Sequence, residues 1–472
     1  MQTVIWSIMP APASGQPLEP AAPDAPLDEA AAFLNAFGTP DVVEVLLPDT
    51  SGILRGKWLP GASLGKVWKD GVAIPLSIFG LDVWGCEVEA TRIHLETGDK
   101  DGLCWPVPGT LRPVPWASRP TAQVLITMHE PDGSPRGRPW RLDPRQQLAK
   151  IVSRFAELGL TPCVAFELEF YLLKPGASGA EPEPVFPATG QARQNMYSMS
   201  DLDAFAEVLH EIREACVAQG LPADTVISEA APGQFEVNLY HRVDPMGAAD
   251  DAILLRRLID GVARRNGLRA TFMAKPLADF AGNGMHVHVS LVDRDGDNFF
   301  ARPGEGDDAL RHAAGGLLST MIDSTLLFVP SFNGYRRLVP GSYAPVSVTW
   351  GYDNRSVAVR VPNGPPKARR LEHRIAGAEA HPHLVLAAIL AGMLEGLERK
   401  IEPPPALAGN AYDRDAPKLS PSMADAVARF ASSPFIARAF GEEYRRVYAV
   451  MKAEELAAFT RVILPLEYET YL

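Results

Sequence analysis

Residues 166–170 read Phe-Glu-Leu-Glu-Phe and lie inside an apolar run, Val164 to Leu173, that is typical of a β-strand. Side chains alternate between the two faces of a strand, so Glu167 and Glu169 share one face while the aromatic and leucine side chains face a core. Two like charges on one face are unfavourable unless a cation lies near both of them. A divalent metal ion is one solution, because hard cations bind carboxylate oxygens. Taken alone, the pair is explained equally well by a solvated strand face.

A second pair of carboxylates flanks a predicted hairpin. One strand ends at Glu229, a Pro-Gly turn follows, and a second strand, residues 235–240, carries Glu236 near its start. The turn brings the two carboxylates back toward one place. Without other motifs, two ordinary glutamates beside a turn would be the better explanation.

The third motif spans residues 282–290, which read Gly-Asn-Gly-Met-His-Val-His-Val-Ser. On a strand, His286, His288 and Ser290 share one face. The glycines at the start let a ligand approach the backbone closely. Histidine is a common metal ligand, although a His-x-His pair by itself is as often structural.

Several arginines gather in residues 333–374, together with Glu372. Guanidinium groups bind the oxygens of phosphate and carboxylate groups. Arg360 interrupts the apolar run 357–361, which argues against a purely solvated role. Carboxylates that bind metals, beside arginines that bind phosphates, indicate phosphoryl transfer. The arginines are Arg336, Arg337, Arg355, Arg360, Arg369, Arg370 and Arg374.

The sequence lacks the other common nucleotide and nucleophile motifs. It has no G-x-x-x-x-G-K-[ST] loop and no kinase signature, so we expect a nucleotide to be held without a P-loop. It also has no G-x-S-x-G motif and no cysteine poised beside a histidine. Catalysis by a serine or cysteine nucleophile is therefore unsupported.

The composition describes an ordinary globular protein of more than one domain, with 472 residues, 46% of them hydrophobic and 22% charged. The net charge of -12 argues against a nucleic-acid partner. The four cysteines form no C-x-x-C pair, so we expect no disulfide framework, and a reducing cytoplasmic location fits. No signal peptide is expected, and the most apolar later stretch, residues 384–394, is too short to span a membrane.

We predict an α+β chain with three parts. Residues 1–27, rich in alanine and proline, form a disordered tail. Residues 28–137 form a small β-rich domain, and residues 138–472 form a larger domain that begins with a helix capped by Asp143. The candidate linker, residues 133–139, contains two glycines and two prolines. Helices are predicted at residues 28–37, 144–158, 201–219, 248–266, 309–329 and 383–400.

In order and spacing, these segments resemble the glutamine synthetase superfamily over residues 28–472. Five motifs carry the resemblance, at residues 166–170, 229–236, 282–290, 333–341 and 354–374. The resemblance implies an N-terminal β-grasp domain followed by the catalytic α+β domain of that family, which binds ATP and metal. It also implies a homo-oligomer, a dodecamer of two hexameric rings, with active sites between neighbouring subunits.

The resemblance further implies roles for individual residues. Two sets of ligands would hold two or more Mg²⁺ or Mn²⁺ ions: Glu169, Glu229 and Glu236 near the amine, and Glu167, His286 and Glu372 near the ATP phosphates. The residues expected at the nucleotide are Tyr240, His288, Ser290, Arg355 and Arg360. The residues expected at glutamate are Gly282, Arg337 and Arg374. The residues expected to act in catalysis are Asp49, Arg337, Arg355 and Tyr343, with Asp49 lent to the amine site of a neighbouring subunit.

The implied reaction has two steps. The γ-carboxylate of glutamate attacks the γ-phosphate of ATP, which gives γ-glutamyl phosphate and ADP. An amine then displaces the phosphate, and an amide forms. Metal ions and arginines stabilise the charge on the transferred phosphoryl group.

Two departures bear on the amine and acid substrates. Ammonia-using members carry a glutamate directly before the Ala-Pro of residues 340–345, where this sequence has Tyr343. Tyrosine is a poor base at neutral pH, but its ring can pack on an alkyl chain or face a cation. Ala281 stands where those members have an asparagine. Residues 370–379 resemble the γ-glutamylpolyamine synthetase branch, although residues 381–383 read His-Pro-His rather than Asn-Pro-Tyr.

We therefore expect an ATP-dependent γ-glutamyl–amine ligase that acts on a polyamine such as putrescine or on a small monoamine. Ordinary glutamine synthetase, which uses ammonium, is the nearest alternative. A non-catalytic, ring-forming descendant is a second alternative, and the retention of all six predicted metal ligands argues against it. Ala281 keeps open an acid substrate other than glutamate.

Overall fold

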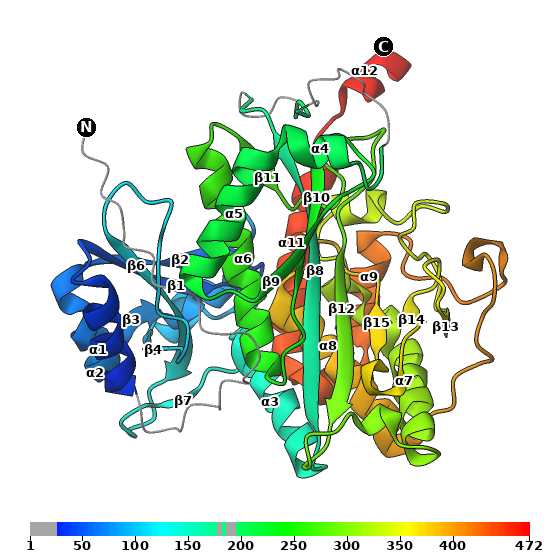
Figure 1. Cartoon of the computed structure of the whole chain (residues 1–472), viewed down its shortest axis with the longest axis horizontal. Helices are drawn as coiled ribbons and strands as arrows, with labels where there is room; N and C mark the ends of the chain where they lie inside the picture. Colours follow the sequence, from blue (N-terminus) through cyan, green and yellow to red (C-terminus); the bar gives the residue numbers. More distant parts are fainter. Residues whose placement is uncertain (1–25, 177–181, 186–194) are drawn as a thin grey trace.

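The computed structural model describes residues 26–176, 182–185 and 195–472 (Figure 1). Most of the predicted tail, residues 1–27, lies outside the described residues. Its last two residues belong to helix α1 (Pro26–Phe37), which begins two residues earlier than predicted. None of the described helices is long and apolar enough to cross a membrane.

Residues 42–139 build the first sheet, whose main strands follow the order β2-β1-β6-β4-β3. The parallel pair β1 and β6 lies in its interior, and the short strands β5 and β7 pair with β6. β7 falls within the predicted linker, so this sheet extends two residues beyond the predicted boundary at residue 137. The assignment of the region as a β-grasp domain stays a prediction. Its strands are β1 (Val42–Pro48), β2 (Leu54–Pro60), β3 (Val72–Pro75), β4 (Asp101–Pro106), β5 (Arg112–Pro113), β6 (Thr121–Glu130) and β7 (Arg138–Pro139).

The second sheet follows the order β13-β14-β15-β12-β8-β10-β9, with β11 paired to β8. Its longest strand, β8, lies between β12 and β10 and pairs antiparallel with both. Figure 1 shows β8 running through the middle of the larger part of the molecule. Its strands are β8 (Thr161–Leu173), β9 (Ala223–Ser228), β10 (Gln234–Leu239), β11 (Arg269–Thr271), β12 (Met285–Val292), β13 (Trp350–Tyr352), β14 (Val359–Val361) and β15 (Leu371–His373).

Helices cover one face of the second sheet. α3 (Pro144–Glu157) and α6 (Pro245–Arg265) pack on β8, and α8 (Pro382–Arg399) packs on both of these helices. α8 is buried along most of its length, which explains its apolar sequence. The other helices are α2 (Leu64–Asp70), α4 (Met199–Ala204), α5 (Ala206–Gln219), α7 (Glu305–Phe328), α9 (Met423–Ser432), α10 (Pro434–Phe440), α11 (Glu442–Thr460) and α12 (Pro465–Tyr471).

Local signals in the sequence account for the elements that carry the site. α3 begins at Asp143, whose side chain accepts a hydrogen bond from the backbone N–H of Arg145. On β8, Phe166, Leu168 and Phe170 are completely buried, which confirms the predicted alternation. The other face of β8 is thereby left to its polar side chains.

The predicted helix at residues 201–219 is interrupted. α4 ends at Ala204 and α5 begins at Ala206, because Phe205 leaves the helical conformation with φ −110° and ψ 13°. The ring of Phe205 packs edge-on against Phe235 of β10, with 5.0 Å between centroids. A core contact therefore overrides the helical pattern at this point.

Four helices after residue 422, α9 to α12, were not predicted from the sequence. α11 packs on α9 and α10 and attaches to the region of the first sheet, because Arg446 Nη2 donates to Thr91 O at 2.8 Å and Lys452 Nζ donates to Ser51 Oγ at 3.2 Å. The mixture of helices and two largely antiparallel sheets confirms the predicted α+β class.

Candidate active site

The register of the second sheet gathers the predicted carboxylates and histidines on one face. Glu167 of β8 lies opposite His286 of β12 and opposite Asn238 of β10. One pair further along, Glu169 lies opposite Glu236. Residues directly opposite each other on paired strands share a face. These five side chains therefore lie on the face that the apolar residues of β8 leave free.

The same face continues across β15 and β14. Glu372 lies opposite His288, and Arg360 lies opposite Glu372. Strands that are more than 200 residues apart in the sequence thus contribute to one polar surface, which we call the candidate face. No local pattern in the sequence predicts how these distant strands pair.

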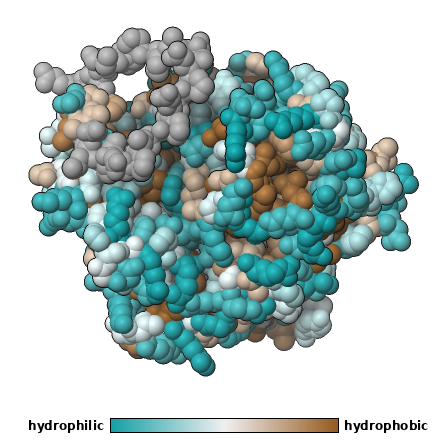
Figure 2. Space-filling view, turned by 90° about the horizontal axis from the view of Figure 1, so that it is seen from below, coloured by the Kyte–Doolittle hydropathy of each residue, from teal (hydrophilic) through white to brown (hydrophobic). Residues whose placement is uncertain are grey.

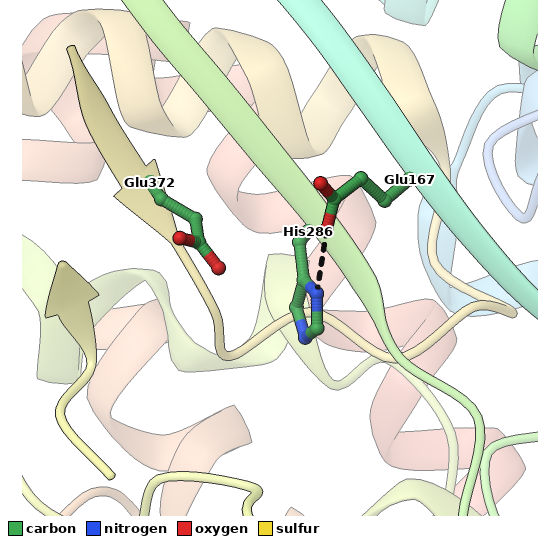
Figure 3. Close-up of side chains that lie close together, drawn as sticks. All are labelled: Glu167, His286 and Glu372. Carbon is green, nitrogen blue, oxygen red and sulfur yellow. Dashed lines mark hydrogen bonds and ion pairs between the residues drawn. The ribbon is translucent and has the colours of Figure 1, made fainter. Parts of the chain in front are cut away.

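Glu167, His286 and Glu372 form a group that could hold a metal ion. One ligand atom of each residue lies within 4.8 Å of the others, and His286 Nδ1 is 3.1 Å from Glu167 Oε2. Figure 3 shows the three side chains coming from neighbouring strands into one space. Their oxygen and nitrogen atoms make a suitable donor set for a divalent cation.

Two arginines orient Glu372 within this group. Arg360 Nη1 donates to Glu372 Oε2 at 2.9 Å, and Arg374 Nη1 donates to Oε1. Burial raises the pKa of Glu372, but the charge of Arg374 is the largest of the opposing effects, and the pKa is lowered to about 2. Glu372 is therefore ionised at neutral pH and available as a ligand.

His288 orients Glu167 from the side. Arg370 Nε donates to His288 Nδ1 at 3.0 Å, so Nδ1 must accept and the proton lies on Nε2. His288 Nε2 then donates to Glu167 Oε1 at 2.8 Å. Burial raises the pKa of Glu167, yet hydrogen bonds to His286 and His288 hold it well below its usual range. The geometry thus gives His288 the part of an orienting donor, while His286 is the residue in position to bind a metal.

A second group consists of Glu169, Glu236 and His286, whose ligand atoms also lie within 4.8 Å of one another. It differs from the set that the family resemblance implied, in which Glu229 rather than His286 joined the two glutamates. Among the described residues, Glu229 joins neither group, although its charge interacts with that of Glu169. Five of the six predicted ligands thus lie within the two groups, and Glu229 lies beside them.

The negative charges of the carboxylates on the candidate face are not balanced by the positive charges around them. Burial, followed by the charges of Glu167, Glu169 and Glu229, raises the pKa of Glu236 to about 10. Burial and the charge of Glu169 raise the pKa of Glu229 to about 7, although Arg355 opposes the shift. A divalent cation among these groups would favour their ionised forms. Electrostatics and donor set both fit a metal ion on this face.

Arg337 lies buried beside the second group. Its Nη1 donates to Ile375 O at 2.9 Å, and its charge interacts with that of Glu169. A Cβ atom at Gly284 would collide with the guanidinium of Arg337, and one at Gly282 would collide with a backbone carbonyl and with the Arg337 side chain. Lack of space, rather than an unusual φ, therefore requires glycine at both positions.

Tyr343 and Arg355 are more exposed than the groups above. Tyr343 is 62% exposed and has a left-handed backbone with φ 56°. The neighbouring carbonyl of Ala344 accepts a hydrogen bond from Tyr412 Oη at 3.1 Å, and the charge of Arg374 acts on Tyr412. These contacts attach the segment around Tyr343 to the arginine side of the candidate face.

The residues expected at the nucleotide are only partly brought together. Ser290 is buried, two positions beyond His288 on β12, and lies opposite Cys163. Tyr240 is 56% exposed, and its hydroxyl bonds Asp224 rather than a side chain of the two groups. Of the residues expected at the nucleotide, His288, Ser290 and Arg360 belong to the candidate face, and Tyr240 lies beyond the end of β10.

Asp49, predicted to reach the amine site of a neighbouring subunit, is held within its own chain by the hairpin of the first sheet. It is completely buried in the β1–β2 turn, where its Oδ1 accepts from the backbone N–H groups of Ser51 and Ile53, each at 2.9 Å. Its Oδ2 accepts from Arg55 Nε at 2.9 Å. Both oxygens accept bonds within this hairpin, so Asp49 holds the turn, and its contribution to the amine site of a neighbouring subunit stays a prediction.

Two residues at the site were missed from the sequence. Asn238 lies opposite Glu167 on β10, and the period-two pattern that starts at Glu236 would have found it. Tyr197 borders the hairpin, because its N–H donates to Ser228 O at 2.9 Å, directly before Glu229. It is 60% exposed with φ 60°, and its irregular surroundings give no periodic signal.

Comparisons with known proteins agree with this geometry. The sequence model described as "Glutamine synthetase, catalytic domain" matches residues 141–471. The chain is 38% identical over 446 residues to gamma-glutamylputrescine synthetase PuuA of Escherichia coli K12, which covers 93% of each protein. It is 33% identical over 445 residues to glutamate–isopropylamine ligase of a Pseudomonas species, which covers 92% of this chain and 95% of that protein.

A solved structure gives the same result for the fold. The structure of a GmaS/ADP complex superposes with a TM-score of 0.82 at 28% identity, over 94% of this chain and 99% of that one. The match therefore includes the first sheet as well as the catalytic region. Because the family model matches residues 141–471, which are most of the chain, the chain belongs to the glutamine synthetase family of ATP-dependent carbon–nitrogen ligases.

Proposed function

We propose that this chain joins the γ-carboxylate of glutamate to an alkylamine, a polyamine such as putrescine or a small monoamine, by way of γ-glutamyl phosphate. Two features together give the main support for this proposal. A full set of carboxylate, histidine and arginine side chains lies on the candidate face, and Tyr343 stands at the position of the ammonium-binding glutamate. Relatives named for putrescine and isopropylamine ligation support the same substrate class.

We propose ATP and two or more Mg²⁺ or Mn²⁺ ions as cofactors. Glu167, His286 and Glu372 would hold one ion. Glu169 and Glu236, with Glu229 beside them, would hold another. When bound, the ions supply positive charge against the phosphate oxygens. The similar structure of GmaS in complex with ADP supports an adenine nucleotide as a ligand.

The chain's own residues would position the reactants in both steps. In the first step an oxygen of the glutamate γ-carboxylate bonds to the γ-phosphorus of ATP, and the bond to ADP breaks. Arg337 and Arg355 would bind carboxylate and phosphate oxygens as charge moves onto ADP. In the second step the amine nitrogen bonds to the carbon of the γ-carboxyl group, the bond from that carbon to the phosphate oxygen breaks, inorganic phosphate leaves, and the nitrogen gives up a proton. Tyr343 would present its ring to the alkyl chain or cationic end of the amine.

We also propose a homo-oligomer, with a dodecamer of two hexameric rings as the specific form. Glutamate and the amine are then the only other partners required. The predicted cytoplasmic location stays a prediction.

The test is phosphate release from ATP with glutamate, Mg²⁺ and a panel of putrescine, isopropylamine, ethanolamine and ammonium. We expect an alkylamine to exceed ammonium in kcat/KM by at least about tenfold, which is about 1.4 kcal/mol of transition-state discrimination. Preference for ammonium would establish an ordinary glutamine synthetase and overturn the argument from Tyr343. No release with glutamate and any amine, but release when another carboxylic acid replaces glutamate, would point to another acid substrate, as Ala281 allows.

A further inference from the structure

The side-chain amides of Gln234 and Asn283, which we call the amide pair, are buried next to the carboxylates of the second group. Gln234 of β10 is 1% exposed, and Asn283 is completely buried just before β12. Gln234 Nε2 donates to Asn283 Oδ1 at 3.0 Å. Gln234 lies two positions before Glu236 on the same strand, so both side chains are on the candidate face. Neither residue takes part in the reaction described above.

Gln234 connects the hairpin to the glycine-rich segment 282–284. Its Oε1 accepts from the N–H of Ala231 in the hairpin turn at 3.3 Å, and its Nε2 also donates to Gly282 O at 3.0 Å. Tyr171, which lies opposite Gln234 on β8, donates from its hydroxyl to Ala281 O at 2.6 Å. One cross-strand pair therefore holds two successive carbonyls of the chain that leads into β12.

Asn283 connects that segment to the chain on its other side. Its Nδ2 donates to Met273 O at 2.9 Å, and its backbone N–H donates to Ala274 O at 2.8 Å. Its backbone carbonyl accepts from Ala378 N–H at 3.1 Å. The side-chain oxygen and amide group of Asn283 both have partners, and such a buried and fully bonded polar network is rigid.

The connection reaches a metal-binding carboxylate in one further step. Gly284, the residue after Asn283, donates its N–H to Glu169 Oε2 at 2.6 Å. Because Oε2 accepts this bond, Oε1 is the oxygen of Glu169 that remains to face the other two residues of the second group. The amide pair also fixes the hairpin between Glu229 and Glu236 through Ala231. The pair is thus connected to Glu169 through Gly284, and it lies on the same strand as Glu236.

We propose that Gln234 and Asn283 act together as a positioning device, which orients Glu169 and Glu236 for metal binding and holds Gly282 at the acid-substrate site. This proposal rests on the proposed metal-dependent function, but it concerns how the ligands are aimed rather than which amine is used. Loss of the hydrogen-bond partners behind metal ligands typically weakens metal affinity by about tenfold to a hundredfold. If the two amides only satisfied buried hydrogen-bonding groups in the core, they would contribute to stability and not to metal affinity.

The primary test is direct Mn²⁺ titration of the full-length protein without substrates, by electron paramagnetic resonance or calorimetry. Gln234→Met keeps the volume of the side chain and removes all three of its hydrogen bonds. We expect the dissociation constant of one Mn²⁺ site to rise about tenfold to a hundredfold, with the other site little changed. The KM for glutamate should rise more than the KM for ATP. An Mn²⁺ affinity within about twofold of the parent protein would overturn the proposal.

The chain offers a matched control in another buried glutamine. Gln219 of α5 is 4% exposed, and its Nε2 donates to Pro113 O at 2.7 Å, in the first sheet. Gln219→Met should lower stability but leave Mn²⁺ affinity unchanged. Equal loss of affinity in both variants would mean a general effect of destabilisation and would overturn the positioning role.

Two further variants test whether the pair acts as one unit. Asn283→Leu combined with Gln234→Met should weaken Mn²⁺ binding no more than the stronger single change, because both remove the same constraint. Additive losses would contradict a single device. If Gln234→Met does not fold, Tyr171→Phe removes only the bond to Ala281 O and should weaken Mn²⁺ binding severalfold. No weakening in that variant would count against the proposal. Because these titrations use no amine or ATP, they can succeed even if the proposed ligase activity fails.

Discussion

Glu236 has the least compensated negative charge among the carboxylates of the candidate face. Its pKa is raised to about 10 by burial and by the charges of Glu167, Glu169 and Glu229. A carboxyl group whose pKa rises on folding adds stability that is fully present below its unfolded pKa, near 4.5, and is lost as pH rises through the folded pKa. Without metal, the free energy of unfolding should therefore fall between about pH 5 and about pH 10.

Glu236→Gln tests this at the level of one residue. The variant removes a titrating group, so the fall in unfolding free energy with pH, measured by urea denaturation in EDTA, should be shallower than in the parent protein. Mn²⁺ should restore stability at high pH in the parent but much less in the variant. We also expect Glu236→Ala to abolish turnover with little loss of fold. A parallel pH dependence in parent and Glu236→Gln proteins would show that Glu236 is ionised without metal.

Tyr343→Glu tests the assignment of amine preference to one side chain. The change places a carboxylate where ammonia-using members of the family have one, so ammonium should become a better substrate and alkylamines worse ones. We expect the ratio of kcat/KM for ammonium to that for the preferred alkylamine to rise at least about tenfold. Tyr352→Glu alters another exposed tyrosine, 59% exposed, and serves as the control. An unchanged ratio in Tyr343→Glu would remove Tyr343 from the amine site.

At the scale of elements, the sequence predicts those whose pattern is local. The alternation in β8 is regular, and α6, α7 and α8 lie within four residues of their predicted ends. The register of the strands has no such local pattern, because the pairing of β12 with both β8 and β15 joins residues that are far apart in the sequence. The proximity of His286 to Glu169 and Glu236 therefore could not be predicted from the sequence, and Glu229 as a ligand beside them stays a prediction. α11 was missed because buried Lys452 and Glu455 interrupt its apolar stripe.

The same ion pair leads to a prediction about how α11 is held. Lys452 and Glu455 are each 2% exposed and lie 2.8 Å apart, with Ser51 and the N–H of Val83 from the first sheet as further partners. Lys452→Met alone leaves a buried carboxylate without its cation and should lower the free energy of unfolding by about 3 to 5 kcal/mol. Lys452→Met with Glu455→Leu replaces both charges by apolar groups and should recover most of that loss. Urea denaturation of the three proteins measures this, and a double variant as unstable as the single one would contradict it.

At the scale of the whole molecule, two of the places where apolar side chains are exposed bear on assembly. Figure 2 shows a compact apolar area on a mostly hydrophilic face, seen from below. The second region is the C-terminal segment, residues 461–472, every residue of which is exposed. Figure 1 shows α12 extending away from the body of the chain. Exposed apolar surface of this extent is typical of interfaces between subunits.

The C-terminal segment gives the last prediction, which concerns assembly. α12 has seven residues, too few for a stable helix in water without packing, and Leu466, Tyr471 and Leu472 are 66%, 82% and 100% exposed. We expect this segment to pack on another copy of the chain in the proposed homo-oligomer. Deletion of residues 462–472 should therefore reduce the assembly to smaller species in light scattering coupled to size-exclusion chromatography. Leu95→Lys, at an 84% exposed leucine in the N-terminal half of the chain, should leave the mass unchanged. If the truncated chain kept the mass per particle of the parent, the segment would have no part in holding subunits together, and the first sheet or the apolar area of Figure 2 would have to form the contacts.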